Sequence, residues 1–376
     1  MTGPGGPEDG PGRTVLFVSV PTGVGGSTRS LATVLAGLDG EVRRVLAGPP
    51  IGRFVALVRD QGAAEEHLAV VSPRRTLRPL HRAWTAARLA RWASRHRRDL
   101  DAIHANGLKE LSLSLPAALV SRARLVVWVH NFLLPPSVRW FGWLWRLLLP
   151  RCDVRWAAVS PLARDLVVEA GLTTAGAVRI VPNPIDPADV VAAERPPAGG
   201  PVTAAYLGAP RAYKGFQDLP AIVEAVPPDA PVRWLVFSHP TDDDLAATWD
   251  ALRDLEAAGR LEVRGKLTDV RQAYARCDVV VCPSLRDSFC RVAAEAMLNG
   301  IPVVGSDLPP IRDLLGEDEA GLLVPPRAPV EAAKAVVRLA EDPDLRARLG
   351  AEGRRRAAAY APTGVCEALL GLYLAP

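Results

Sequence analysis

The sequence predicts an α/β protein of two domains, each a parallel sheet covered by helices. Short apolar runs, typical of buried parallel strands, alternate with helical patterns along most of the chain. Around residues 187–201 the composition changes to Pro, Ala and Gly, and the alternation then starts again. A chain of 376 residues is long enough for two domains of ordinary size.

The first domain begins with an apolar run at 14–20, a Gly-rich turn at 23–27 and a helical pattern. Three later apolar runs, at 101–104, 125–130 and 156–160, each end in a polar residue: His104, His130 and Ser160. The carboxyl ends of parallel strands line the ligand crevice of such folds, so these three residues are site candidates.

The same patterns give the domain boundaries. We expect a disordered lead-in over 1–12, an N-terminal domain over 13–186 and a linker over 187–201. A second domain follows over 202–358, and a C-terminal helix at 359–376 is expected to return to the first domain. The strands of the second domain are expected at 202–208, 232–238, 261–263, 279–282 and 302–305.

Composition and charge exclude several classes of protein. The net charge of +4 gives no global attraction to nucleic acid. Five cysteines without a C-x-x-C pair do not indicate a zinc site, and the odd number favours reduced thiols and a cytoplasmic location. The longest apolar run, 140–150, carries Arg146 and is too short to span a bilayer.

The segment 283–304 carries the strongest chemical signal. A loop with Asp287 precedes a helix that starts near Arg291 and contains Glu295 among apolar residues. We expect free amides near residues 288–291 to favour an anion such as a diphosphate, while the carboxylates accept hydrogen bonds from hydroxyls. The residues alone leave a structural alternative open, in which Arg291 and Glu295 form a surface pair and Asp287 caps the helix.

This segment resembles the signature of the family-4 retaining glycosyltransferases of the two-domain GT-B type. That signature reads P-S-x-x-E-x-F-G-x-x-x-x-E-A-M-x-x-G-x-P-V-V, and nearly every element is matched in order. The sequence departs from it at Asp287, where the family has Glu, and at Cys290, where it has Gly. Both departures bear on the donor sugar rather than on the class of enzyme.

The resemblance covers almost the whole ordered chain. Gly25 and Gly26 match a Gly-rich loop that approaches the donor phosphate, and His130 matches a His near the reacting sugar. The segment 208–215 is similar to the family's G-R-x-x-x-x-K-G phosphate loop, with Lys214 aligned. The family's Arg is Ala209 here, so Arg211, two residues later, is expected to supply the second charge.

The resemblance implies two Rossmann-like domains facing each other across a cleft, and transfer from a nucleoside-diphosphate sugar to a hydroxyl acceptor with retention. It implies that Glu295 binds the ribose, Asp287 the sugar hydroxyls, and Lys214 and Arg211 the phosphate. No cofactor or metal is implied, and the acids at 242–244 are interpreted as structural. The expected catalytic residues are His130, Asp287 and Lys214, and the expected donor-binding residues are Gly25, Gly26, Arg211, Lys214, Asp287, Ser288, Phe289, Cys290, Arg291, Val292 and Glu295.

Three rival functions remain as alternatives. A nicotinamide-binding fingerprint is disfavoured because Thr28 occupies the position of its third Gly. A sugar-nucleotide epimerase of the same fold would show no dependence on an acceptor. A degenerate, non-catalytic sugar-nucleotide-binding subunit would fit the changes at Ala209, Asp287 and Cys290.

Two further segments of the N-terminal domain concern the acceptor or a membrane. The stretch 74–98 holds nine Arg, two His and no acid, and places Trp84 and Trp92 two turns apart on one helix. The segment 138–149 is rich in Trp and Leu. Together they could dock on anionic lipid or bind an acidic or aromatic acceptor. A solvated Arg face over a Trp/Leu core helix is the structural alternative, and it is slightly favoured. We expect a cytoplasmic enzyme, with peripheral contact to the inner face of the membrane as a further hypothesis.

Overall fold

The computed structural model describes residues 12–21, 23–70, 78–134, 136–190, 200–240, 245–265 and 269–374, and not the side chains of 78–80, 136–141 and 189. The chain divides into two compact units. The first runs to Pro184 and resumes at Pro362, and the second is Ile185–Ala361. Most of the predicted lead-in, the linker residues 191–199 and the acids at 242–244 lie outside the described residues.

The first unit is built on a seven-stranded parallel sheet with the order β3-β2-β1-β4-β5-β6-β7. Its central strands β1 and β5 are almost wholly buried, as continuous apolar runs predict. The strands are β1 (Thr14–Val18), β2 (Arg43–Gly48), β3 (Glu66–Ala69), β4 (Leu100–Ala105), β5 (Arg124–Val129), β6 (Val154–Ala158) and β7 (Val178–Ile180).

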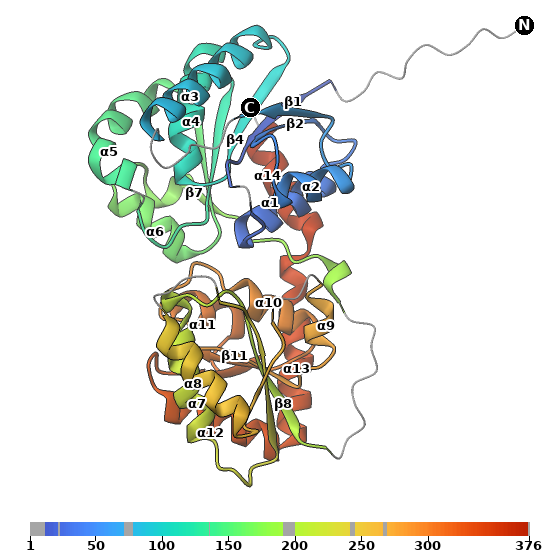
Figure 1. Cartoon of the computed structure of the whole chain (residues 1–376). Helices are drawn as coiled ribbons and strands as arrows, with labels where there is room; N and C mark the ends of the chain where they lie inside the picture. Colours follow the sequence, from blue (N-terminus) through green and yellow to red (C-terminus); the bar gives the residue numbers. More distant parts are fainter. Residues whose placement is uncertain are drawn as a thin grey trace, which may run out of the picture. The chain divides into compact units, whose positions relative to one another are not determined.

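Helices cover both faces of this sheet (Figure 1). One face carries α3 (Arg78–Arg95) and α4 (Leu108–Ser121), and the other carries α1 (Gly26–Gly37) and α14 (Pro362–Leu374). The remaining helices are α2 (Arg53–Asp60), α5 (Pro136–Leu148) and α6 (Pro161–Glu169).

The last helix, α14, belongs to the first unit although 177 residues of the second unit precede it. It packs against α1, β4 and β5. The hydroxyl of Tyr373 lies 2.7 Å from Nδ1 of the buried His104, and Val365, Cys366 and Leu369 are buried with it. Residues at the far end of the chain therefore complete the core beneath β4.

The second unit has a six-stranded parallel sheet with the order β10-β9-β8-β11-β12-β13. Its strands are β8 (Val202–Leu207), β9 (Val232–Phe237), β10 (Glu262–Val263), β11 (Val279–Cys282), β12 (Val303–Ser306) and β13 (Gly321–Val324). Its helices are α7 (Leu219–Ala225), α8 (Ala246–Ala257), α9 (Arg271–Tyr274), α10 (Arg291–Leu298), α11 (Pro309–Leu315), α12 (Pro329–Glu341) and α13 (Pro343–Ala357), on both faces of the sheet (Figure 1).

Both sheets reverse their strand order at one point. In the first sheet successive strands run outward in opposite directions from the β1–β4 pair, and in the second from the β8–β11 pair. Ligands of open α/β sheets bind at the carboxyl ends of strands beside such a switch point. The segments that follow β1, β4, β8 and β11 are therefore where each unit is expected to hold its ligand.

Candidate functional site

Lys214 lies in a short turn that follows β8. The turn, Ala212–Lys214, ends at Gly215, whose φ of +69° is rarely adopted by residues with a side chain. A Cβ at this position would lie 1.8 Å from the carbonyl oxygen of Pro283. The glycine thus allows the turn to approach the loop that follows β11, the neighbouring strand at the switch point.

The approach brings Lys214 to Asp287. Nζ of Lys214 lies 2.6 Å from Oδ2 of Asp287, and the carboxylate side chain is 9 % exposed. Burial raises the pKa of Asp287, but the ammonium group of Lys214 and the backbone amides of Cys290 and Phe289 together lower it by more, so the net pKa is lowered. Burial lowers the pKa of Lys214, but the negative charge of Asp287 opposes this effect and the net pKa of Lys214 is raised. Both groups are therefore charged at neutral pH.

The amides after Asp287 are not free, contrary to our expectation. Oδ1 of Asp287 accepts hydrogen bonds from the backbone N–H groups of Ser288 (2.9 Å) and Phe289 (3.4 Å). The carboxylate folds back on its own loop because these amides would otherwise be buried without an acceptor. Asp287 is also not the helix cap, since the N-cap of α10 is Cys290.

Glu295 is held inside the second unit rather than on its surface. Its carboxylate accepts from Nε of Arg291 at 2.7 Å and from the hydroxyl of Tyr274 at 2.7 Å. The side chains of Arg291 and Glu295 are only 10 % and 3 % exposed. The predicted i,i+4 pair exists, but it is a buried pair and Glu295 is not a lone carboxylate among apolar residues.

The other predicted donor residues of the second unit lie in the same two segments, after β8 and after β11. Ser288 and Phe289 are buried, and Arg211 is exposed at the start of the Lys214 turn. Cys290 is buried and has a φ of +54°, the left-handed conformation that glycine adopts most readily. Its thiol hydrogen-bonds to Cys282, which is the largest cause of the raised pKa of Cys282. Val292 follows in the first turn of α10.

The first unit gathers its polar residues beside its own switch point. Gly25 is the N-cap of α1, and no atom lies within 4 Å of a Cβ added at Gly25 or Gly26. His130, after β5, is partly exposed, and its Nε2 lies 3.0 Å from Oδ1 of Asn106, after β4. Burial lowers the pKa of His130 to about 3, so the imidazole is neutral at physiological pH.

Glu110 is a site candidate that the sequence prediction missed. It lies in the first turn of α4 and is 4 % exposed, and its carboxylate accepts from the backbone amide of Val20, just after β1. Burial raises the pKa of Glu110 to about 7, against the opposing effect of these amides, Lys109 and Arg82. The position of Glu110 in the helix that follows β4 could have marked it as a site residue in the sequence. An acid in a first helical turn, however, usually indicates only a favourable interaction with the helix dipole.

The raised pKa of Glu110 makes stability depend on pH. Between its ordinary value of 4.5 and about 7, the folded chain keeps a proton that the unfolded chain has lost, so the free energy of unfolding falls as pH rises. We expect Glu110→Gln to remove this fall, by at most about 3 kcal/mol between pH 5 and 8. Urea denaturation at several pH values measures it. The control is Glu169→Gln, at an exposed position, which should keep the pH dependence of the wild type. An identical pH dependence in wild type and Glu110→Gln would contradict the raised pKa of Glu110.

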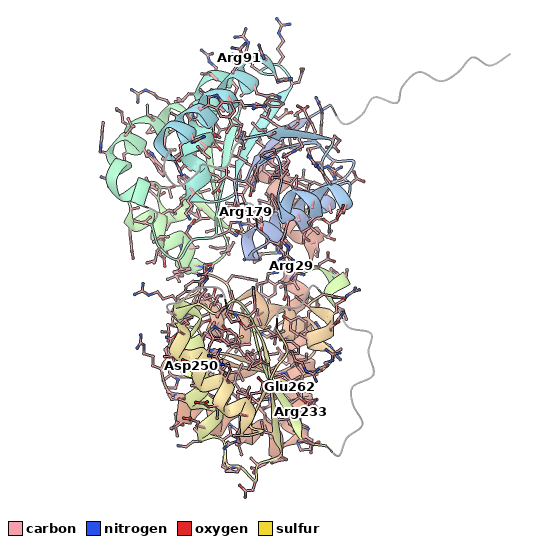
Figure 2. The ribbon with its side chains drawn as sticks, in the orientation of Figure 1. Arg29, Arg91, Arg179, Arg233, Asp250 and Glu262 are labelled. Atoms are coloured by element: carbon pink, nitrogen blue, oxygen red, sulfur yellow. The ribbon has the colours of Figure 1, made fainter. Side chains whose placement is uncertain are left out.

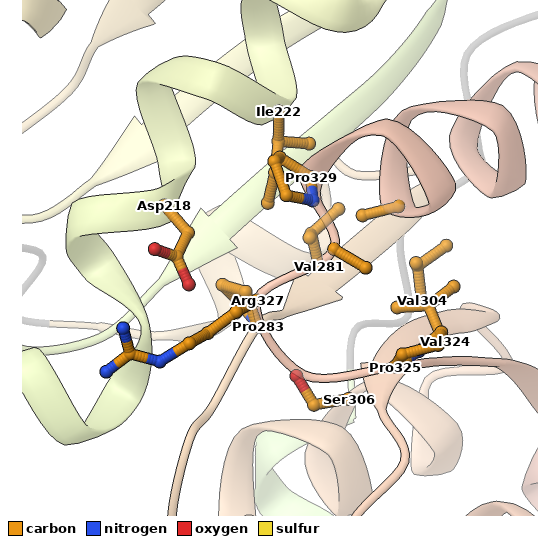
Figure 3. Close-up of a pocket in the computed structure, with 12 residues that line it drawn as sticks. Asp218, Ile222, Val281, Pro283, Val304, Ser306, Val324, Pro325, Arg327 and Pro329 are labelled. Carbon is orange, nitrogen blue, oxygen red and sulfur yellow. The ribbon is translucent and has the colours of Figure 1, made fainter.

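A small cavity lies at the carboxyl ends of β11, β12 and β13 (Figure 3). Its walls include Val281, Val304 and Val324, with Asp218 and Arg327 among the polar residues. Lys214, Asp287 and Glu295 do not line it, so it is separate from the predicted donor residues. Within the described ranges, no group of three His, Cys, Asp or Glu side chains could hold a metal ion.

The basic helix α3 has one clearly exposed face. Trp84, Arg88, Arg91 and Arg95 recur at helical spacing and are exposed, and Arg88 lies over the ring of Trp84. Arg91 on this face is labelled in Figure 2. Trp92 does not share this face: it is buried, stacks on His96 and donates to Glu66. The two tryptophans lie on one helix, as expected, but only Trp84 faces solvent.

Helix α5 divides its aromatic residues in the same way. Trp143 and Leu147, one turn apart, are 65 % and 51 % exposed, whereas Trp145 and Leu149 are buried. The segment is thus a core helix that also presents an apolar pair to solvent. The side chains of residues 138–141 lie outside the described part of the chain.

Comparison with known families gives two adjoining matches. Residues 21–189 match the model of "Glycosyltransferase Family 4", and residues 202–342 match the model of "Glycosyl transferases group 1". Curated relatives include a D-inositol 3-phosphate glycosyltransferase of Corynebacterium glutamicum, 29 % identical over 45 % of this chain and 42 % of the relative. Another, from Kineococcus radiotolerans, is 34 % identical over 36 % of this chain and 32 % of the relative. The chain matches less than half the length of these relatives.

Solved structures share the fold over nearly the whole chain. Anabaena HepE (Alr3699), crystallised with UDP and glucose, has a TM-score of 0.79 at 20 % identity, covering 95 % of this chain and 98 % of HepE. A glycosyltransferase of Rickettsia africae has a TM-score of 0.79 at 14 % identity, covering 96 % and 97 %. The predicted fold class is confirmed.

Proposed function

The chain belongs to the family-4 glycosyltransferases with the GT-B fold, and from this premise we propose that it moves a glycosyl group from a nucleoside-diphosphate sugar to a hydroxyl acceptor with retention of configuration. The observation that carries the proposal is the buried arrangement after β8 and β11. There Lys214 is paired with Asp287, and Glu295 lies buried within α10. A cation beside a hydroxyl-binding carboxylate suits a ligand that bears both phosphates and sugar hydroxyls.

The comparisons support a nucleotide sugar as the donor. HepE, which shares the fold, was crystallised with UDP and with UDP-glucose. We assign the nucleotide to the carboxyl edge of the second sheet, with Glu295 at the ribose, Lys214 and Arg211 at the diphosphate, and Asp287 at the sugar hydroxyls. The acceptor is assigned to the first unit, and a metal ion is not expected to be required.

The contacts of the carboxylates favour a front-face mechanism. Asp287 is engaged by Lys214 and two amides, and Glu295 by Arg291 and Tyr274, so neither is poised as a covalent nucleophile. In the proposed reaction the bond between the anomeric carbon and the phosphate oxygen breaks through an oxocarbenium-like state. The acceptor oxygen bonds to the same face, and its proton passes to the leaving phosphate. Lys214 stabilises the charge that develops on that phosphate.

A release assay tests the function. A thermal-shift screen of nucleoside diphosphates first identifies the base, because a ligand of the native state raises its stability by about 2.7 kcal/mol at a hundredfold excess over Kd. The full chain is then incubated with the matching sugar nucleotides and a panel of hydroxyl acceptors. Acceptor-dependent release of nucleoside diphosphate is the expected result. Tight nucleotide binding without release would instead identify a non-catalytic binding subunit.

We further propose that the exposed faces of α3 and α5 contact an anionic membrane. Arg88, Arg91 and Arg95 supply positive charge, and Trp143 and Leu147 supply an apolar pair. In the described part of the chain, only the helical stretch Pro343–Leu374 is long and apolar enough to cross a bilayer, and buried residues of α14 form part of it. The proposed contact is therefore peripheral, which fits a cytoplasmic enzyme that works on a membrane-bound or soluble acceptor.

Vesicle sedimentation tests the membrane proposal. Each basic residue near an anionic surface contributes about 1 kcal/mol, so the protein should sediment with vesicles containing phosphatidylserine at low salt. Screening at 1 M salt shortens the reach of exposed charges to about 3 Å and should release most of it. Reversing Arg91 and Arg95 to Glu should abolish binding, whereas reversing Arg253 on α8 should not. Absence of binding at low salt would reject the proposal.

A further inference from the structure

A line of buried polar side chains connects the candidate residue His130 with the Gly-rich turn. Asn106, 6 % exposed, stands between them at the end of β4. Its Oδ1 lies 3.0 Å from Nε2 of His130, and its Nδ2 lies 3.4 Å from both the backbone oxygen of Ser27 and the hydroxyl of Ser19. One carboxamide thus contacts the segments that follow β5 and β1.

The contact with Ser27 fixes which way the carboxamide faces. A backbone carbonyl can only accept a hydrogen bond, so the amide nitrogen of Asn106, and not its oxygen, must face Ser27. The oxygen therefore faces His130. Because a carboxamide oxygen can only accept, Nε2 of His130 must carry the proton that joins them.

The state of the second ring nitrogen follows. Burial keeps His130 neutral at physiological pH, so the ring has one proton and Nδ1 carries a lone pair. The carboxamide of Asn183, 6 % exposed, also interacts with the ring and raises the pKa of His130, but burial has the larger effect. The buried His104 is a titratable neighbour of His130. Burial and His130 lower the pKa of His104 to about 3, against the effect of a contact with Asn106, so it brings no charge to the site at physiological pH.

We propose that Asn106 is a positioning residue that locks His130 in the Nε2–H tautomer and ties the imidazole to the Gly-rich turn at Ser27. His130 then acts as an oriented neutral dipole and not as a general acid or base. Any shift of the turn that moves Ser27 also moves the ring, because both depend on the same carboxamide. This inference rests on the proposed function for its catalytic meaning, but the tautomer itself does not.

Nitrogen-15 spectra of the full-length protein labelled at histidine test the tautomer directly. His130→Gln identifies the signals of residue 130. The expected wild-type pattern is a protonated Nε2 and an unprotonated Nδ1, unchanged from pH 8 to pH 5. Asn106→Asp places a carboxylate beside Nε2–H and should raise the pKa of His130 by about 1–3 pH units. Asn106→Ala should allow both tautomers.

Asn131→Ala is the matched control. This neighbouring Asn accepts a hydrogen bond from the backbone amide of Leu108. The contact between Asn106 and His130 does not involve Asn131, so the signals of His130 should keep their pattern. A protonated Nδ1 in the wild type, or an unchanged pattern in Asn106→Ala, would overturn the proposal. Because neither result needs turnover, this outcome is independent of whether the enzyme assignment holds.

Kinetics then test the positioning role. With the donor found in the release assay, Asn106→Ala should lower kcat about 100-fold while the affinity for the nucleoside diphosphate stays within twofold. Asn106→Asp should introduce a new ionisation in the pH profile of kcat. Equal losses in nucleotide affinity and kcat, without a new ionisation, would reduce Asn106 to a purely structural residue and reject the role.

Discussion

Lys214→Met is expected to lower turnover by about 100- to 1000-fold, because it removes the cation placed to stabilise the departing diphosphate. Folding should also suffer, since the variant leaves the buried carboxylate of Asp287 without its cation and with only backbone amides as hydrogen-bond donors. We expect a loss of about 1–3 kcal/mol in the free energy of unfolding. Steady-state release of nucleoside diphosphate and urea denaturation measure the two effects separately.

Two further variants separate charge stabilisation from packing. The double variant Lys214→Met/Asp287→Asn should recover part of the lost stability, because the buried negative charge is gone, and none of the turnover. Lys334→Met removes an exposed i,i+3 pair with Glu331 and should change stability by less than about 0.5 kcal/mol. Wild-type turnover in Lys214→Met would remove this residue from the mechanism and direct attention to Arg211.

Glu295→Gln is expected to weaken the binding of the donor nucleotide at least tenfold. Hydrogen bonds to a charged group contribute about 1.5–3 kcal/mol, and the variant removes the charge that is proposed to hold the ribose hydroxyls. The structure adds a second consequence, because Arg291 loses the carboxylate 2.7 Å from its Nε in a buried setting. Titration calorimetry with the nucleotide gives the affinity, and thermal melting gives the stability.

Tyr274→Phe is the matched control for Glu295→Gln. It removes the 2.7 Å hydrogen bond that the hydroxyl of Tyr274 donates to the carboxylate of Glu295. The charges of Glu295 and Arg291 stay in place. Stability should fall by about 1 kcal/mol, with nucleotide affinity nearly unchanged. If Glu295→Gln binds nucleotide like the wild type while folded, or if Tyr274→Phe is equally impaired, the ribose role is wrong.

The fold class could be predicted because its signals are local. A continuous apolar run such as Val15–Val18 reads as a buried parallel strand, and the repeated alternation with helical patterns gives the class. The start of α10 at Arg291 was predicted in the same way. Periodicity alone could not assign the solvent-facing side of α3. Whether Trp84 or Trp92 is buried depends on the distant Glu66, which bonds the indole of Trp92.

The contacts of the candidate site could be predicted only in part. The signature indicated that Asp287 and Lys214 matter, but not that they touch, since 73 residues separate them and the contact depends on Gly215 fitting against Pro283. Glu110 and Asn106 were passed over as site residues for a similar reason. Glu110 contacts the backbone of Val20, and Asn106 contacts that of Ser27. Both backbone groups follow β1, so these contacts form only once the sheet has folded.

The return of the chain to the first unit has a consequence for biosynthesis. The ribosome makes residues 185–361 before it makes α14, so the first sheet must wait for a covering helix until the whole second unit has emerged. His104 meets the hydroxyl of Tyr373 only then. Nascent chains arrested after Ala361 should therefore hold a folded second unit and a first unit that proteases still cut, a reversal of the usual N-to-C order. A fragment of the first unit made alone would need residues 362–374 added back, in cis or as a peptide.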